Sequence, residues 1–230
     1  METFPIAPPL PDDVLVRRTQ LPSKPEGVAL EGSRVRLAPL DLERDAKALF
    51  VVSNGAPAHL GERSVESYDA DAVIWRYMSG GPFVTVNDLA TWLAAQVDSP
   101  TALCLTVFDV DSGRPVGATN LMANFPQHLK IELGNIWYSP LVQGTQVNRE
   151  ATYLMLRHAF ELGYRRVEWK CDALNERSRR AALGMGFTFE GIQEQHFIIK
   201  GRNRDTAWFR ILDHEWPELQ RRFETRLSNE

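Results

Sequence analysis

The most regular pattern in the sequence lies between residues 147 and 163, where mostly apolar side chains recur at the spacing of one helix face. The stripe consists of Ala151, Leu154, Met155, His158, Ala159 and Leu162. Gly163 follows the last of these positions, which is typical of the C-terminus of a helix. This segment therefore predicts an amphipathic helix that must bury one face against another element.

Two segments with the alternation of a β-strand flank this helix. Lys130–Tyr138 precedes it, and Arg166–Asp172 follows it with Val167, Trp169 and Cys171 alternating with polar residues. Because a helix connects these two strands, they can pair in parallel within one sheet.

The other segments predict further strands with short connections, and such strands pair antiparallel. In chain order we expect a strand at Arg34–Leu37, helices from Asp41 to Val52 and from Thr85 to Val97, strands at Ala102–Val110 and Pro115–Leu121, a helix from Asn175 to about Gly184, a hairpin of strands 187–200 and 205–212 across Gly201–Asn203, and a last helix at about 213–228. This order predicts an α+β fold with a mixed, mostly antiparallel sheet and helices on both faces.

Residues 1–33 are rich in proline and predict an extended N-terminal arm, because proline fixes φ and lacks an amide donor. Residues 34–230 are expected to form a single domain. The first residues lack the basic and apolar regions of a signal peptide, so we expect a cytoplasmic protein.

The overall composition excludes several classes of function. The net charge of −4 argues against nucleic-acid partners and anionic membranes, and no apolar run reaches the 18 residues of a membrane span. Cys104 and Cys171 are the only cysteines, which predicts neither a disulfide framework nor a metal site.

The segment 139–148, between the first flanking strand and the helix, can be read in two ways. It can be an ordinary loop in which Thr145 caps the helix, or a phosphate cradle formed by Gly144 and the amides of the helix N-terminus. A lone glycine does not decide between them.

The segment 175–187 also has an ordinary structural interpretation. Asn175 can be a helix cap, the commonest use of asparagine there, and Arg177, Arg179 and Arg180 can be a solvated face.

Together, the two segments resemble the GNAT superfamily of acetyl-CoA-dependent N-acetyltransferases, specifically its RimJ/RimL-like branch. The resemblance covers residues 34–215 and is strongest at 130–212. Asn175, Ser178, Gly186 and Phe187 match the family pattern of Asn, a small residue three positions later, and Gly-Phe at eleven and twelve. Gln143 matches the start of the family's phosphate loop, but Gln146 and Asn148 stand where its small residues normally lie.

The resemblance implies a sheet that is splayed at its parallel strand pair, with acetyl-CoA bound between the two strands. It implies that backbone groups of Trp137 and Tyr138 hold the pantetheine and that Asn175 bonds this arm. The pyrophosphate would be held by Gln143, Gly144, Thr145, Gln146, Val147 and Asn148. An amine would then attack the thioester directly, with no covalent enzyme intermediate and no metal.

Two residues are candidates for the proton transfers that this chemistry requires. Glu132 can accept the proton of the amine, or it can be a surface or ion-paired carboxylate of its strand. Many family members have a tyrosine acid seven residues after the helix-opening Asn, where this chain has Ala182. By resemblance, Ser178 replaces it as the acid, unless Ser178 only caps the helix or bonds CoA.

The acceptor side is expected to contain aromatic residues from the early part of the chain and residues of the 187–212 hairpin. These candidates are Trp75, Tyr77 and Phe83, with Gln195 and His196, and the aromatic ones can equally belong to the core. A primary amine, either a small molecule or a protein N-terminus, is the expected acceptor for a monomer or homodimer. The alternative is a non-catalytic acyl-CoA-binding or interaction domain, which would bind acetyl-CoA without turnover.

Overall fold

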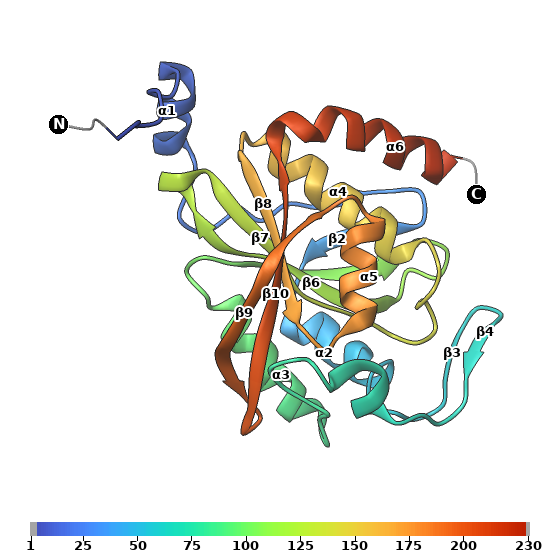
Figure 1. The fold of residues 1–230 in the computed structure, drawn as a ribbon. Helices are drawn as coiled ribbons and strands as arrows, with labels where there is room; N and C mark the ends of the chain where they lie inside the picture. The colour runs from blue at the N-terminus through green and yellow to red at the C-terminus, as the bar shows by residue number, and fades with distance from the viewer. Residues whose placement is uncertain (1–3, 229–230) are drawn as a thin grey trace.

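The protein, described here by a computed structural model over residues 4–228, is built on one eight-stranded sheet (Figure 1). The strand order is β1-β2-β5-β6-β7-β8-β10-β9, and only β7 and β8 pair in parallel. The strands are β1 (Leu30–Glu31), β2 (Val35–Pro39), β5 (Leu103–Asp109), β6 (Pro115–Phe125), β7 (Lys130–Tyr138), β8 (Arg166–Asp172), β9 (Thr188–Ile199) and β10 (Arg202–Leu212). The mixed, mostly antiparallel sheet predicted from the sequence is confirmed.

Helices cover both faces of the sheet, as predicted, and each face has its own hydrophobic core. One core contains side chains of α4 (Val147–Glu161), α5 (Glu176–Gly184) and α6 (Trp216–Ser228), with a 3₁₀ turn at Asp213–Glu215 before α6. The other contains side chains of α2 (Leu42–Val51), the π-helix η1 (Asp71–Trp75) and α3 (Val86–Val97). Within residues 4–228, no helix is both long and apolar enough to cross a membrane.

Local signals placed several helix starts correctly. The Asp41 carboxylate accepts the amide hydrogen of Arg44 at the start of α2. At the start of α3, Thr85 and Asp88 form a capping box. The predicted bounds of β7 and β8 are those of the structure.

The first 33 residues differ from the extended arm that we predicted, because Asp12–Gln20 forms the helix α1. The prolines flank this segment rather than interrupt it. Two aspartates in its first turn and two arginines in its last turn complement the helix dipole. Downstream of α1, the Asn124 side chain donates hydrogen bonds to the carbonyls of Pro22 and Ser23, at 2.8 and 3.0 Å.

Three smaller features were also not predicted. The hairpin β3–β4 (Ala58–Leu60 and Arg63–Val65) and the π-helix η1 lie in the stretch that the sequence left irregular. The β9–β10 hairpin turns at Lys200 and Gly201, both with positive φ, rather than across Gly201–Asn203. Positive φ at both central residues suits the right-handed twist of the strands in a two-residue turn.

Glu150 of α4 connects this helix to the start of the sheet. Its carboxylate is 4% exposed and accepts the amide hydrogens of Ser33, Arg34 and Val35 at 2.8–2.9 Å, together with the Ser33 hydroxyl at 2.8 Å. Gly32 is required beside it, because a Cβ at that position would lie 2.8 Å from the Glu150 Cδ. One buried carboxylate thus satisfies the backbone where β2 begins.

We predict that Glu150→Gln lowers the free energy of unfolding by about 3 kcal/mol, because the amide NH₂ must face backbone donors that lose their acceptor. For a domain of this size, that corresponds to a fall in Tm of about 6–12 °C. Glu161→Gln, on an exposed position of the same helix, is the control and should change Tm very little. Equal Tm values for the two variants would show that the Glu150 bonds contribute nothing.

Candidate functional site

The parallel pair β7–β8 is joined over only part of its length. Lys130–Leu133 pairs with Arg166–Trp169, but β7 continues to Tyr138 and β8 to Asp172 without further pairing. On its other side, β7 carries a bulge against β6, where two residues, Asn135 and Ile136, lie opposite one. Asn135 has φ of 49°, and a bulge of this kind bends its strand. The two strands therefore separate beyond Leu133, which confirms the predicted splay.

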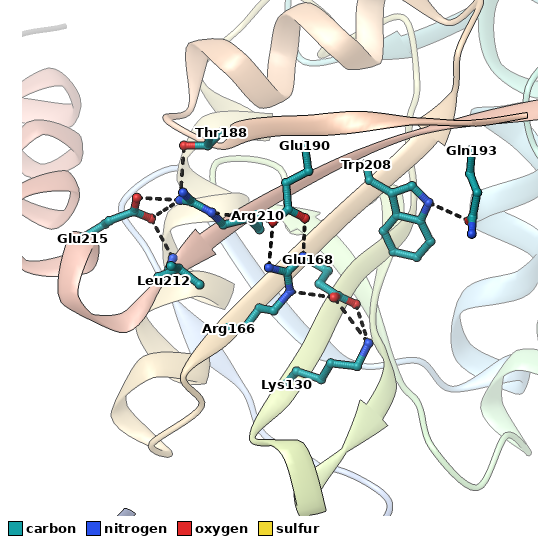
Figure 2. A network of polar contacts seen from close by, with 10 residues as sticks. All are labelled: Lys130, Arg166, Glu168, Thr188, Glu190, Gln193, Trp208, Arg210, Leu212 and Glu215. Atoms are coloured by element: carbon teal, nitrogen blue, oxygen red, sulfur yellow. Dashed lines mark hydrogen bonds and ion pairs between the residues drawn. The ribbon is translucent and has the colours of Figure 1, made fainter. Parts of the chain in front are cut away.

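A network of charged side chains lies at the joined end of these strands (Figure 2). Glu168 of β8 accepts from Lys130 of β7 at 3.1 Å and from Nε of Arg166 at 2.7 Å. Arg166 also binds Glu190 of β9 through both of its terminal nitrogens, and this contact lowers the pKa of Glu190. Arg210 of β10 extends the network to Glu215 ahead of α6. Ion pairs thus tie four adjacent strands together below the splay.

A cavity of about 380 Å³ occupies the opened end. Nine of the residues predicted for the site line it: Tyr77, Glu132, Trp137, Tyr138, Gln143, Gly144, Asn148, Asn175 and Ser178. Seven others do not: Trp75, Phe83, Thr145, Gln146, Val147, Gln195 and His196. The cavity therefore brings together the strand, loop and helix residues that the sequence grouped, and it leaves out most of the predicted acceptor side.

The loop between β7 and α4 meets the cavity through only some of its residues. Gly144 has φ of 77° and open space where a Cβ would lie. Thr145 does not cap α4 as an N-cap residue; its hydroxyl donates to the Val142 carbonyl at 2.7 Å and accepts the Val147 amide at 3.3 Å. The N-cap position belongs to Gln146, whose side chain is bound by Arg149. An anion at this helix start would meet Gly144 and Asn148 rather than Gln146.

Asn175 and Ser178 have the structural role that the sequence left open, and they also border the cavity. The Asn175 carbonyl oxygen caps α5 by accepting the Ser178 amide at 3.1 Å. The Ser178 hydroxyl accepts the Trp169 indole N–H at 3.1 Å. Capping is thus confirmed, and it holds both side chains at the cavity wall.

Arg177 is a cavity residue that the sequence analysis placed in a solvated charge run. Its guanidinium donates to the carbonyls of Ala72 and Val73, at 3.2 and 2.9 Å, and to the Gln143 side chain at 3.4 Å. All three acceptors are uncharged, so they do not neutralise the positive charge that the guanidinium places beside the loop. Its position just inside a helix that follows a strand was the signal that could have identified it.

Glu132 lies where the two strands begin to separate and is 2% exposed, so it is not a surface carboxylate. Burial raises its pKa, and the neighbouring Glu168 adds to this effect. Lys170 forms an ion pair with it at 2.8 Å and, together with Arg204, opposes the rise in pKa. The ion-paired alternative is confirmed, but in a buried setting on the cavity wall.

Most of the residues that were predicted to bind the acceptor substrate do not line the cavity. Trp75 is 1% exposed, donates its indole N–H to the Ser53 carbonyl at 2.9 Å, and packs edge-on against Phe83 and Trp92. Trp75 is therefore a core residue and the half-buried Phe83 packs against this core, whereas Tyr77 lines the cavity. His196 lies on β9 beside Phe197, and burial lowers its pKa. Lys170 and Arg204 were not predicted, although both line the cavity.

We predict that Lys170→Met makes stability depend on pH. Without the ammonium, the pKa of Glu132 rises further. A carboxyl whose folded pKa exceeds its unfolded pKa stabilises the fold when protonated, and this stability is lost as pH rises through the folded pKa. Urea unfolding should show the variant about 3 kcal/mol less stable than the parent at pH 8, and much closer to it at pH 5.

The double variant Lys170→Met/Glu132→Gln is the control for this prediction, because it lacks the carboxyl that titrates. It should show no such pH-dependent loss. An equal loss at both pH values in Lys170→Met would mean that Lys170 acts through its packing on Trp208, whose ring centre is 5.2 Å from the ammonium.

Comparison with known proteins gives a consistent family. A family model described as an acetyltransferase (GNAT) domain matches residues 34–188. The crystal structure of a GCN5-related N-acetyltransferase from Brucella melitensis is 38% identical, with a TM-score of 0.78, and the match covers 88% of this chain and 86% of that one. A probable acetyltransferase of the GNAT family from Chromobacterium violaceum is 36% identical, with a TM-score of 0.77, over 94% and 100% of the two chains.

The similarity to RimL concerns the fold. The structure of this ribosomal L7/L12 alpha-N-protein acetyltransferase is 16% identical to the chain, with a TM-score of 0.65, over 81% of this chain and 94% of that one. A search of the curated proteins finds no match.

Proposed function

The chain belongs to the acetyltransferase (GNAT) family, and from this premise we propose that it transfers the acetyl group of acetyl-CoA to a primary amine. The observation that carries the proposal is the cavity at the opened β7–β8 pair, which is lined by a buried carboxylate, by amide groups of the β7–α4 loop and by the guanidinium of Arg177 on α5. Family membership supplies the acetyl-CoA-dependent reaction, and the residues of this cavity supply its particular form.

The residues present suit acetyl-CoA. Beyond Leu133, the edge of β7 that faces β8 is not paired with it, so its backbone groups can hold the pantetheine at Trp137 and Tyr138. Gly144, Asn148 and Arg177 can hold the phosphates, because they combine open space, a helix N-terminus and a positive charge. Asn175 can bond the pantetheine arm through its amide nitrogen while its oxygen caps α5.

Glu132 has the properties that a base for an amine requires. An amine is largely protonated near neutral pH and must lose a proton before it can attack a carbonyl. The bound acetyl-CoA supplies the activated thioester. Burial raises the pKa of Glu132, so its carboxylate is a stronger base than an exposed one, and the Lys170 ammonium opposes this rise.

Ser178 is the candidate for returning a proton to the leaving thiolate. Its hydroxyl accepts from Trp169 at the wall of the cavity that it lines, and a hydroxyl that accepts a hydrogen bond can still donate its own hydrogen. Ala182, at the position of the family's usual tyrosine, is fully buried and has no group that can donate.

The test is a thermal-shift titration with acetyl-CoA, with ATP as the control nucleotide, followed by thiol release with a panel of amines. Acetyl-CoA at 100 times its Kd should stabilise the protein by about 2.7 kcal/mol. Binding followed by amine-dependent thiol release supports the enzyme. Binding without release from any amine would indicate the non-catalytic acyl-CoA-binding domain, and no binding would contradict the proposal.

We predict that Glu132→Gln lowers kcat by about 10²- to 10⁴-fold while the Kd for acetyl-CoA stays near that of the parent. The parent's rate should fall on the acidic side through a pKa above 4.5, the ordinary value for glutamate, because the folded protein raises it. Steady-state rates across pH 5–9 check this. A variant that keeps the rate and the acidic limb of the parent would remove Glu132 from the mechanism.

We predict that Arg177→Gln weakens acetyl-CoA binding by about tenfold, because one charge-assisted contact to a phosphate is lost. Arg180→Gln is the matched control, since Arg180 lies on the same helix, is exposed and contacts Glu176. Calorimetric titration of both variants gives the comparison. Equal weakening in the two would show only a general effect of charge, and no weakening would leave Arg177 a structural residue.

A further inference from the structure

Arg204 of β10 is a cavity-lining cation whose charge opposes the rise in the pKa of Glu132 but forms no ion pair with it. Its side chain forms no ion pair within residues 4–228, and its Nε is buried without a hydrogen-bond partner. Its guanidinium carbon lies over the ring of Phe197, 5.7 Å from the ring centre. A buried donor on a charged group is costly unless something accepts from it, so this arrangement suits a site that an anion completes.

A bulge in the β9–β10 hairpin sets the position of Arg204. Arg204 pairs with Phe197, but the next pairing joins Thr206 to Gln193, so β9 holds two extra residues between these points. Gln195 in this bulge has φ of 50°. Asp205 fixes it by accepting the Gln195 amide at 2.8 Å and the Asn203 side chain at 2.8 Å. The carboxylate of Asp205, which follows Arg204 in the sequence, therefore accepts a hydrogen bond from the backbone of β9.

The other charges of the cavity do not neutralise Arg204 either. Glu132 is paired with Lys170, and Asp172 accepts the amide hydrogen of Leu174 at 2.9 Å. Arg177 adds a second cation, on the loop side of the cavity. With two carboxylates and three cations, the wall carries one excess positive charge.

Unpartnered polar atoms concentrate in the same region. Across residues 4–228, six residues have a buried side-chain polar atom without a hydrogen-bond partner. Four of them, Trp137, His196, Arg204 and Thr206, lie on β7, β9 or β10, and a fifth, Glu132 of β7, has its ion pair with Lys170 at that oxygen. Buried polar groups in proteins are nearly always satisfied, and a cluster of exceptions points to a ligand.

The hairpin tip contacts η1, two residues of which, Val73 and Ile74, line the cavity. Lys200, at the turn between β9 and β10, donates to the Trp75 carbonyl at 2.7 Å at the end of η1. Figure 1 shows the long β9–β10 hairpin extending toward the side of the sheet that carries α2 and α3. A contact between the hairpin and η1 leaves less room for a polypeptide and favours a small acceptor.

We infer that the acceptor is a small primary amine that also carries an oxyanion, with its amine at Glu132 and its oxyanion at Arg204. The inference rests on the proposed acetyl transfer, and it adds the class of acceptor. Carboxylates and phosphates share the required chemistry, because either can accept two hydrogen bonds from one guanidinium. Arg204 is thus a specificity-determining residue for the acceptor.

The experiment compares matched acceptors that differ only at the far end. One arm is a series of ω-amino carboxylates of increasing chain length, and a second is the corresponding aminoalkyl phosphates. The corresponding ω-amino amides and diamines lack the anion. The parent should acetylate one of the anionic series with kcat/KM at least about tenfold above its amide, and the two arms show which oxyanion is preferred.

The variants Arg204→Gln and Arg202→Gln complete the design, since Arg202 is an exposed arginine on the same strand. Arg204→Gln should raise KM for the anionic amine by about ten- to a hundredfold, with little change for the amide, and Arg204→Lys should restore part of the loss. Arg202→Gln should match the parent. The Kd of the anionic amine in the presence of free CoA, measured by thermal-shift titration, should change in parallel with KM.

Each outcome separates the inference from the proposed function. If the parent binds acetyl-CoA but acetylates the amines of ω-amino amides, diamines or peptides as efficiently as those of the anionic compounds, the inference is overturned and the acetyl transfer stands. The same holds if Arg204→Gln changes KM equally for acid and amide. If the parent does not bind acetyl-CoA, the proposed function fails, and direct titration of the anionic amines then decides whether Arg204 binds them.

Discussion

The arrangement of the whole site depends on the point at which β7 and β8 stop pairing. Four residues of each strand pair in parallel, and beyond Leu133 and Trp169 the strands separate while both stay in the sheet through their outer neighbours. The separation leaves backbone groups of β7 facing a cavity rather than a partner strand. Unpaired backbone of this kind is stable only if water or a ligand satisfies it, so the opening of the sheet is itself a binding feature.

The charges on either side of this point have different surroundings. Glu132 and Glu168 lie opposite each other in the parallel register, and both are buried. Glu168 faces the joined end and receives hydrogen bonds from both Lys130 and Arg166, as Figure 2 shows. Glu132 lines the cavity and has Lys170 as its ion-pair partner. One carboxylate therefore holds the strands together, and the neighbouring one keeps a raised pKa at the cavity.

Much of the framework could be predicted from the sequence, because local patterns determine it. The alternation in Lys130–Tyr138 and Arg166–Asp172, and the apolar stripe of the helix between them, predicted a parallel pair with correct strand bounds. Capping residues identified the starts of α2 and α5, and apolar spacing identified α3. The Asn175 and Gly186 spacing indicated the family, which the family model confirms.

The rest depends on contacts that no local pattern records. The bulges at Asn135 and Gln195 place non-glycine residues at positive φ inside segments that the sequence predicts as continuous strands. The bulge at Asn135 opens the strand pair, and the bulge at Gln195 sets the position of Arg204. Without these bulges, cavity cations such as Arg204 look like ordinary strand or surface charges in the sequence. Trp75 and Phe83 illustrate the reverse error, because aromatic side chains near a site and in a core have the same spacing.

Hydrogen exchange of β7 in the presence and absence of acetyl-CoA tests the central claim most directly. If the opened edge of β7 binds the co-substrate, amides of residues 134–138 that face β8 should exchange more slowly once acetyl-CoA is bound. Amides of residues 130–133, which already lie in the paired region, should change little. A protein that is thermally stabilised by acetyl-CoA but shows unchanged exchange at 134–138 would contradict the account, because the ligand would then bind elsewhere.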